Sequence, residues 1–283
     1  TDTKTFKAGD AYVLLIRGDR STTLNSNTAV GPATTLRATG KLVVGSKTVT
    51  NLSSTLGGFS LIGNPYQAKV NMADLLSSVN SSGVSSQFVY IYDPTLGTRG
   101  GYATVTLADG NNTFSIPETS NANQFLEPNQ AFFVETTTTN PVVAFKESFK
   151  TIATENNTTF KVSEPLTNLN INLFYDGIDT NSVDALRVQF RPGANNAKDT
   201  LDATKVWNYD EWFAIDRHPN YMSIETRAMP IKQDSISFYL GNFTRSAYRI
   251  ELKPENFSSA KGYLHDNYLE SSVELTPEVS TSV

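Results

Sequence analysis

The chain has 283 residues, of which 39% are hydrophobic, 11% aromatic and 18% charged, and it contains no cysteine. This length favours two domains with real cores, and the lack of cysteine excludes disulfides, thiolate nucleophiles and cysteine-ligated metal sites. The formal net charge of −5 gives no electrostatic attraction to nucleic acid or to anionic lipid, so neither is expected as a partner.

In the first half, the hydrophobic pattern predicts mainly strands. Residues 12–16 and 88–92 are apolar throughout, which is typical of central strands covered on both faces. Residues 103–107 alternate apolar and polar side chains, which predicts a strand with one buried face. Residues 142–149 read as the last strand of this half.

One short helix is expected in the same half. Its apolar stripe, at the spacing i, i+3, i+4 and i+7, consists of Met72, Leu75, Leu76 and Val79. Asn71 is a plausible N-cap, and Asp74 lies where a carboxylate favours the positive end of the helix dipole. We expect Leu75 and Leu76 to be buried against the sheet of the first domain.

The best domain boundary lies near residue 150, because residues 151–159 are polar and a new series of alternating strands follows. The predicted strands of the second half are residues 169–173, 186–190, 236–240, 248–252 and 273–275. Residues 202–207 read as a second short turn of helix. The sequence therefore predicts an all-β protein with two β-sandwich-like domains, 1–150 and 151–283, the second Ig-like or jelly-roll-like.

No catalytic constellation is recognisable. The two histidines, His218 and His265, lie in unrelated segments and belong to no zinc-binding motif, and neither a nucleophile elbow nor a phosphate-binding loop is present. Arg17, Gly18 and Asp19 form an integrin-type tripeptide, but after an apolar strand they are better read as a turn. We therefore expect a non-enzymatic protein that needs no cofactor, with calcium as the exception considered next.

A loop in the second half is rich in oxygen ligands, namely Asp176, Asp179, Asn181 and Asp184. Calcium takes six to eight hard oxygens, and such a loop can supply several of them. The spacing does not match an EF-hand, and the alternative interpretation is a turn whose Asp and Asn side chains bind their own backbone.

Aromatic residues concentrate at Trp207, Tyr209 and Trp212, followed by Phe213. Their rings could stack on sugars and so form a glycan-binding site. The alternative is core packing, because Trp and Tyr commonly fill the junction between a core and its rim.

Several backbone motifs carry a resemblance to a known family. A strand ends in Gly63-Asn64-Pro65-Tyr66, a later one ends in Tyr92-Asp93-Pro94, and Pro128-Asn129-Gln130 precedes Ala-Phe-Phe-Val. Further elements are Arg17-Gly18-Asp19-Arg20, Asp202-Ala203-Thr204-Lys205 and the segment 262–269. Together they resemble the C-terminal region of large surface proteins exported by the type IX secretion system of Bacteroidota, and they cover nearly the whole chain.

This resemblance implies a location and a role. The protein would be secreted or displayed on the cell surface, as a structural or adhesive module preceding the sorting domain. Its partners would be the export machinery during transit and neighbouring domains of the same polypeptide. The alternative is a carbohydrate-binding module of a secreted polysaccharide-degrading enzyme, with surface glycans as partners.

Three further expectations concern export and the end of the chain. In Asp199-Thr200-Leu201, Thr200 matches the pattern glycosylated on exported Bacteroidota proteins, and Ser235 matches it less convincingly. No apolar run reaches the roughly 18 residues of a transmembrane helix, and the first residues lack a signal peptide, so an exported chain would be a fragment of a precursor. The family pattern also implies one more strand after Val283.

Overall fold

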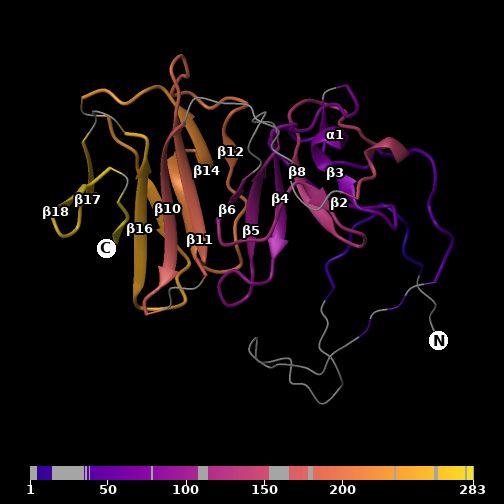
Figure 1. Ribbon diagram of the computed structural model, residues 1–283, viewed down its shortest axis with the longest axis horizontal. Coiled ribbons are helices and arrows are strands. Elements are labelled where there is room, and N and C mark those ends of the chain that lie inside the picture. Colours follow the sequence, from indigo (N-terminus) through magenta and orange to yellow (C-terminus); the bar gives the residue numbers. More distant parts are fainter. Residues whose placement is uncertain are drawn as a thin grey trace. The chain divides into compact units, whose positions relative to one another are not determined.

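The computed structural model describes residues 5–14, 35, 37, 39–77, 79–107, 114–152, 166–177, 181–232, 234–257, 261–277 and 279–282. In these ranges the protein is nearly all β, which confirms the predicted fold class, and the one α-helix is α1 (Met72–Leu76) (Figure 1). No helix in the described ranges is long and apolar enough to cross a membrane.

The chain forms two compact units, and they are not simply its two halves. The first consists of residues 1–91, 105–113 and 123–157, and the second of residues 92–104, 114–122 and 158–283. The predicted boundary at residue 150 thus differs from this division, because two pieces of the first half are grouped with the second unit. The described residues 12–14 form no strand and are exposed, so the central strand predicted there is wrong for these positions.

Short strands build the first unit. β2 (Phe59–Gly63) pairs with β8 (Ala131–Glu135), and a five-stranded sheet has the order β2-β8-β4-β5-β6. Its other strands are β4 (Phe88–Asp93), β5 (Gly101–Thr106) and β6 (Ser115–Ile116), of which β6 and most of β5 belong to the second unit. The separate antiparallel pairs are β1 (Lys47–Val49) with β9 (Val143–Phe145) and β3 (Val70–Asn71) with β7 (Phe125–Leu126). A 3-10 turn, η1 (Glu147–Phe149), ends the strand predicted at 142–149.

The Gly-Asn-Pro-Tyr and Pro-Asn-Gln signatures have one structural purpose in this unit. The side-chain amide of Asn64 donates to the backbone oxygens of Ala68 and Leu126, at 2.9 and 3.1 Å, and its oxygen accepts from the Tyr66 amide. The backbone amide of Asn64 donates to the backbone carbonyl of Gln130 at 2.9 Å. The two signatures therefore fasten the turn after β2 to the entry of β8.

The helix begins as predicted and ends sooner. Asn71 caps it, accepting from the amide of Ala73 at 3.1 Å, and Leu75 and Leu76 are buried. Val79 is 85% exposed, so its place in the apolar stripe is wrong. The side chains of Asn80 and Ser81 stabilise this early end of the helix. They donate hydrogen bonds to the backbone carbonyls of Asp74 and Leu75, at 3.0 and 2.6 Å, which would otherwise lack partners at the end of a helix.

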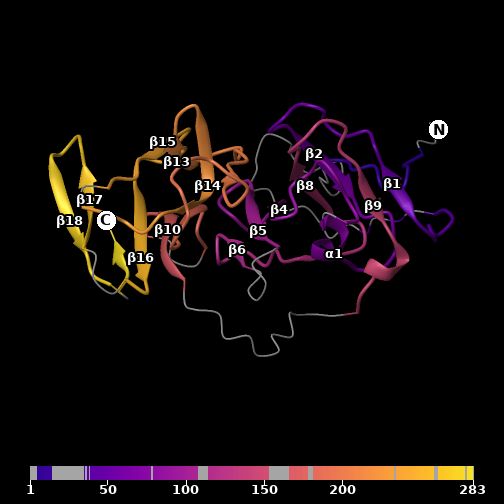
Figure 2. The same ribbon diagram turned by 90° about the horizontal axis from the view of Figure 1, so that it is seen from above.

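A large curled sheet forms the second unit (Figure 2). Its order is β15-β13-β14-β11-β10-β16-β19, and β12 pairs with β14. The strands are β10 (Thr167–Tyr175), β11 (Asp184–Phe190), β12 (Ala203–Thr204), β13 (Trp212–Arg217), β14 (Asn220–Arg227), β15 (Phe238–Gly241), β16 (Tyr248–Glu255) and β19 (Thr281–Ser282). The turn of helix predicted at residues 202–207 is wrong, because β12 lies there instead. The backbone amide of Lys205, just after this strand, donates to the carbonyl of Tyr221 in β14. β11 and β14 are parallel, whereas their other neighbours in the sheet are antiparallel.

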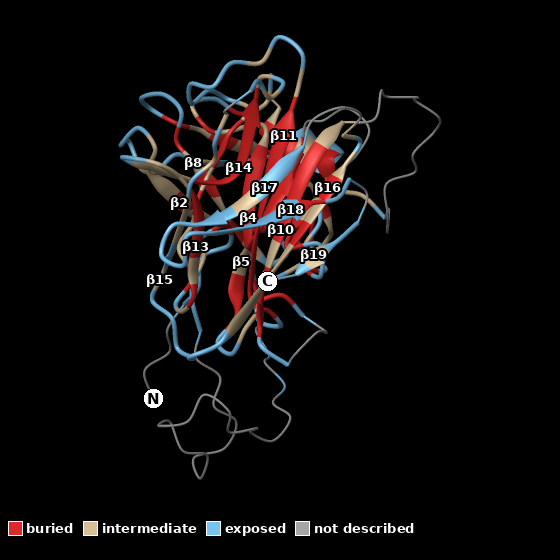
Figure 3. Cartoon of the chain, turned by 90° about the vertical axis from the view of Figure 1, so that its left-hand side faces the viewer, coloured by how far each residue is buried: buried red, intermediate tan, exposed pale blue. Residues whose placement is uncertain are grey.

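One face of this sheet makes the core of the second unit. Strands β10, β11 and β14 are buried along most of their length (Figure 3). Leu173, Leu186 and Met222 are among the core residues, and they alternate with polar residues such as Asn170, Arg187 and Ser223 that face the other side. A hairpin of β17 (Gly262–Asp266) and β18 (Ser271–Leu275) packs Leu264 and Leu275 against the same core.

We expect Leu75→Ala or Leu76→Ala to lower the free energy of unfolding of the first unit by about 2–5 kcal/mol, because each change leaves a cavity at a buried site. Val79→Ala is the matched control and should change it by less than about 0.5 kcal/mol, since this side chain is exposed. Urea unfolding followed by circular dichroism measures the effect. Equal unfolding curves for all three variants would contradict the buried helix face.

Candidate functional site

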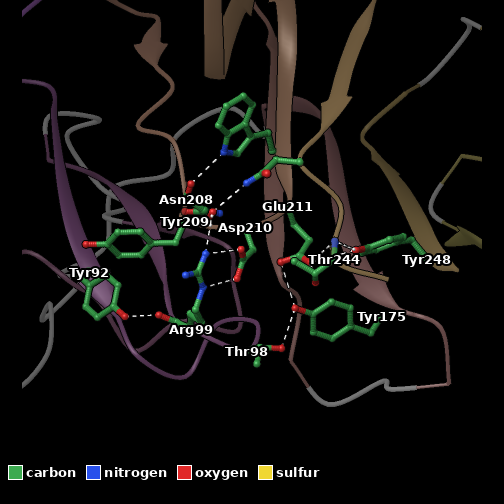
Figure 4. Close-up of polar contacts among 12 residues, drawn as sticks. Tyr92, Thr98, Arg99, Tyr175, Asn208, Tyr209, Asp210, Glu211, Thr244 and Tyr248 are labelled. Carbon is green, nitrogen blue, oxygen red and sulfur yellow. Dashed lines mark hydrogen bonds and ion pairs between the residues drawn. The ribbon is translucent and has the colours of Figure 1, made fainter. Parts of the chain in front are cut away.

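The candidate site is the segment of residues 207–212, which leads from β12 into β13 and carries the predicted ligand-binding rings. Figure 4 shows residues 208–211 of this segment with their polar contacts. Trp207 and Trp212 are half-buried, whereas Tyr209 is 51% exposed. None of these three rings belongs to the hydrophobic core of the second unit. The half-buried tryptophans fit the alternative interpretation, in which Trp and Tyr fill the junction between a core and its rim, as well as they fit a ligand site.

The two tryptophans belong to a cluster of four rings. Trp207 lies 5.2 Å from Trp212 and 5.2 Å from Tyr221, and 5.8 Å from Tyr239, measured between ring centroids. Tyr221 and Tyr239 were not predicted as site residues. The alternating pattern of β14 and β15 could have identified them. Both residues alternate with core-facing residues in these strands, so they share the opposite face of the sheet with Trp212.

Hydrogen bonds fix the backbone of the segment. The indole nitrogen of Trp212 donates to the carbonyl of Asn208 at 3.0 Å, and the Asn208 side chain accepts from the amide of Tyr102 at 2.8 Å. The Tyr209 carbonyl accepts from the side chain of Asn242 at 2.8 Å. The rings are thus carried on a rigid support whose bonds reach β5 and the residue following β15.

Arg99 adds a charged attachment. Its guanidinium donates two hydrogen bonds to the carboxylate of Asp210, one of them from Nε at 2.5 Å, and it lies over the ring of Tyr209, 5.5 Å from the centroid. This hydrogen bonding raises the pKa of Arg99. The Arg99 carbonyl accepts from the hydroxyl of Tyr92 in β4, so the turn that carries Arg99 is also fastened to the strand before it (Figure 4).

Glu211 anchors the other end of the segment. Its carboxylate accepts from the hydroxyls of Tyr248 and Tyr175, at 3.0 and 3.1 Å, and from the hydroxyl of Thr244. Thr98 bonds to the same Tyr175 hydroxyl at 3.0 Å. Burial raises the pKa of Tyr175, so this hydroxyl stays protonated and able to donate. The carboxylate is engaged on both oxygens, and its partners come from two separate parts of the chain, the end of β10 and residues 244–248.

Three of the four predicted calcium ligands lie among the described residues, and their surroundings differ. Asp184 is buried and paired with Lys205 at 2.5 Å, and both side chains are 1% exposed. Asp176 and Asn181 are exposed, and Asp179 lies outside the described residues. No three His, Cys, Asp or Glu side chains in the described ranges are grouped so that they could hold a metal ion.

The remaining predicted positions are scattered over the surface. Thr200 is exposed in a turn, where Asp199 accepts from the amide of Leu201 at 2.8 Å, and Ser235 is also exposed. His218 is exposed, and His265 is 2.9 Å from Ser272 across the β17–β18 hairpin. Arg17, Gly18 and Asp19 lie outside the described residues.

The described residues hold a second set of attachments that sequence reasoning missed. Arg187 lies on the face of β11 that points away from the hydrophobic core, which we call the outer face of the large sheet. It donates hydrogen bonds to Asn170 and to Glu118 at 2.6 Å each, and its guanidinium lies 3.9 Å from the centroid of the Phe114 ring. Thr104 and Ser223 share a hydrogen bond of 3.0 Å. Pieces 92–104 and 114–122 are therefore bound to the outer face of the large sheet. No local pattern marks these partners, since they are up to 119 residues apart.

Comparison with known proteins gives one match. The family described as Domain of unknown function (DUF8693) matches residues 2–279. Searches of curated proteins and of solved structures found no significant match.

We expect Glu211→Gln to lower the free energy of unfolding of the second unit by about 1–3 kcal/mol, because an amide nitrogen cannot accept from the buried hydroxyls. Glu270→Gln, at an exposed position, is the control and should have no measurable effect. Urea unfolding followed by tryptophan fluorescence reports the change, since Trp207 and Trp212 both lie in this unit. A Glu211→Gln variant as stable as the control would contradict the anchoring role.

Proposed function

The chain belongs to the DUF8693 family, and we propose that it acts as a non-enzymatic structural or adhesive module of a large secreted or cell-surface protein. The observation that carries this proposal is that the polar groups gathered from distant parts of the second unit are engaged with one another. Arg99 is bound to Asp210, Glu211 to three hydroxyls, and Asp184 to Lys205.

Such pairing suits support rather than catalysis. A general base or nucleophile needs an accessible group held near a reacting atom, and its activating partner must be arranged around that atom. The Lys205–Asp184 pair is buried, and burial raises the pKa of the Asp184 carboxyl despite the opposing charge of Lys205. These charges fix the position of chain segments, which is the task of a module that presents other domains.

The motifs that resemble type IX cargo support the same proposal. Asn64, Gln130 and Tyr66 fasten the first unit internally, and Lys205 is part of the buried ion pair of the second. They are therefore features of a scaffold. On this basis we propose export by the type IX system of Bacteroidota, with the export machinery and neighbouring domains of the same polypeptide as partners.

A second candidate is a carbohydrate-binding module. It is favoured by the four-ring cluster of Trp207, Trp212, Tyr221 and Tyr239, which lies off the core and is only half-buried. Trp and Tyr combine an apolar face with a polar tip, and surface rings of this kind suit neutral sugars. The rings pack edge-to-face or tilted against each other, which also suits a small accessory core, so we rank this function second.

Antibodies against the chain test the principal proposal. On intact cells of the source organism they should label the surface or detect the protein in the medium, and disruption of the type IX outer-membrane translocon should retain it inside the outer membrane. A cytoplasmic location in both strains would contradict it. Titration of neutral oligosaccharides against tryptophan fluorescence separates the second candidate, because a saturable change that Trp207→Ala abolishes would favour sugar binding over a purely structural role.

A further inference from the structure

The β17–β18 hairpin stands apart from the other strands of the second unit. Its two strands pair with each other in the register that places Leu264 opposite Val273, and the described residues form no other pairing with them. Figures 1 and 2 both show β18 on the outer side of the hairpin, away from β16. The free side of β18 therefore presents the backbone groups of an edge strand.

Apolar surface accompanies this edge. Leu264 and Leu275 pack against the core, but Val273, on the same face of the hairpin, remains 40% exposed. Figure 3 shows the hairpin mostly as exposed surface in front of the buried strands. An added strand beside β18 would cover the Val273 side chain and would widen the layer that the β17–β18 hairpin forms over the core.

The edge of β18 also lacks the features that usually prevent strand addition. β16 carries Lys253 and Pro254 and is covered by β19 at Glu251 and Leu252. β18, with the sequence Ser-Ser-Val-Glu-Leu, contains no proline and no lysine or arginine. Its one charge, Glu274, is paired with Lys261 at 3.0 Å. Proline and charged side chains are the common means of protecting an edge, and here only one neutralised charge is present.

The sequence of β18 is compatible with itself. In a two-fold antiparallel pair centred on Val273, this valine lies opposite its own copy, Ser272 lies opposite Glu274, and Ser271 opposite Leu275. No like charges face each other, and the central pair is apolar, which is the favourable arrangement for cross-strand neighbours. A two-fold interface also uses the same surface on both molecules and closes on itself.

We propose that β18 is an interaction surface for a second copy of this chain, which pairs with it edge to edge and antiparallel about Val273. Five residues on each side make a small contact, so the dimer is weak, with a Kd of roughly 0.1–1 mM. The proposal is independent of the surface location and of sugar binding, because it concerns the purified chain alone.

Opposite charges introduced at position 273, the centre of the pair, test this proposal. In analytical ultracentrifugation, the wild-type chain should shift from monomer to dimer mass with rising concentration. Val273→Lys and Val273→Glu should each remain monomeric, because each places like charges opposite one another. An equimolar mixture of the two variants should dimerise again, since the introduced lysine then faces the introduced glutamate.

Tyr268→Lys is the control, because this residue is 92% exposed in the turn between β17 and β18 and lies outside the central pair. It should dimerise like the wild type, and unchanged circular dichroism of all variants confirms that they are folded. A wild-type chain that stays monomeric up to about 1 mM would overturn the proposal. So would two monomeric variants whose mixture also remains monomeric, because association would then not run through Val273 facing its own copy.

Discussion

Two arginines hold pieces of the first half of the chain inside the second compact unit. Arg187 projects from the outer face of β11 and binds Glu118 and the ring of Phe114, whereas Arg99 reaches from the turn after β4 to Asp210. When both faces of a sheet are buried, the apolar face needs a hydrophobic core, and the polar face needs other chain segments that supply hydrogen-bond partners. Asn170, Arg187 and Ser223 are buried polar residues of the outer face, and hydrogen bonds within the unit engage the Asn170 side-chain oxygen, the Arg187 guanidinium and the Ser223 hydroxyl. The order of β10, β11 and β14 and the position of the aromatic segment depend on this cover.

The buried charges of the second unit are better explained by specificity than by stability. An ion pair as deeply buried as Lys205 and Asp184 loses most of its hydration, and its attraction repays that loss only in part. Removing one partner would leave an uncompensated charge, so the pair selects one arrangement of β11 and the segment after β12. The same reasoning applies to Glu211, which gathers Tyr175, Thr244 and Tyr248. The role we propose, a module that presents other domains, calls for such a unique geometry more than for additional stability.

Local patterns in the sequence predicted much of the fold. Alternation located β10, β11 and β16, and the cap at Asn71 located the start of α1, because these features depend on neighbouring residues. The early end of α1 depended on Asn80 and Ser81 binding backward to its carbonyls, which the apolar stripe through Val79 did not reveal. For the candidate site, the pattern identified Trp207, Tyr209 and Trp212 and missed Arg99, Tyr221 and Tyr239. Those partners come from other strands, and only the topology brings them together.

Expression of residues 151–283 alone tests most directly whether the second unit requires the two pieces from the first half. Without residues 92–104 and 114–122, the outer face of β11 and β14 loses Glu118 and Thr104 as partners, and Asp210 in the segment before β13 loses Arg99. Amide hydrogen exchange should then show loss of protection in these strands relative to the full chain, and tryptophan fluorescence should show no cooperative unfolding transition. Protection equal to that of the full chain, with a cooperative transition at the same urea concentration, would contradict the account and would mean that residues 151–283 form an independent domain.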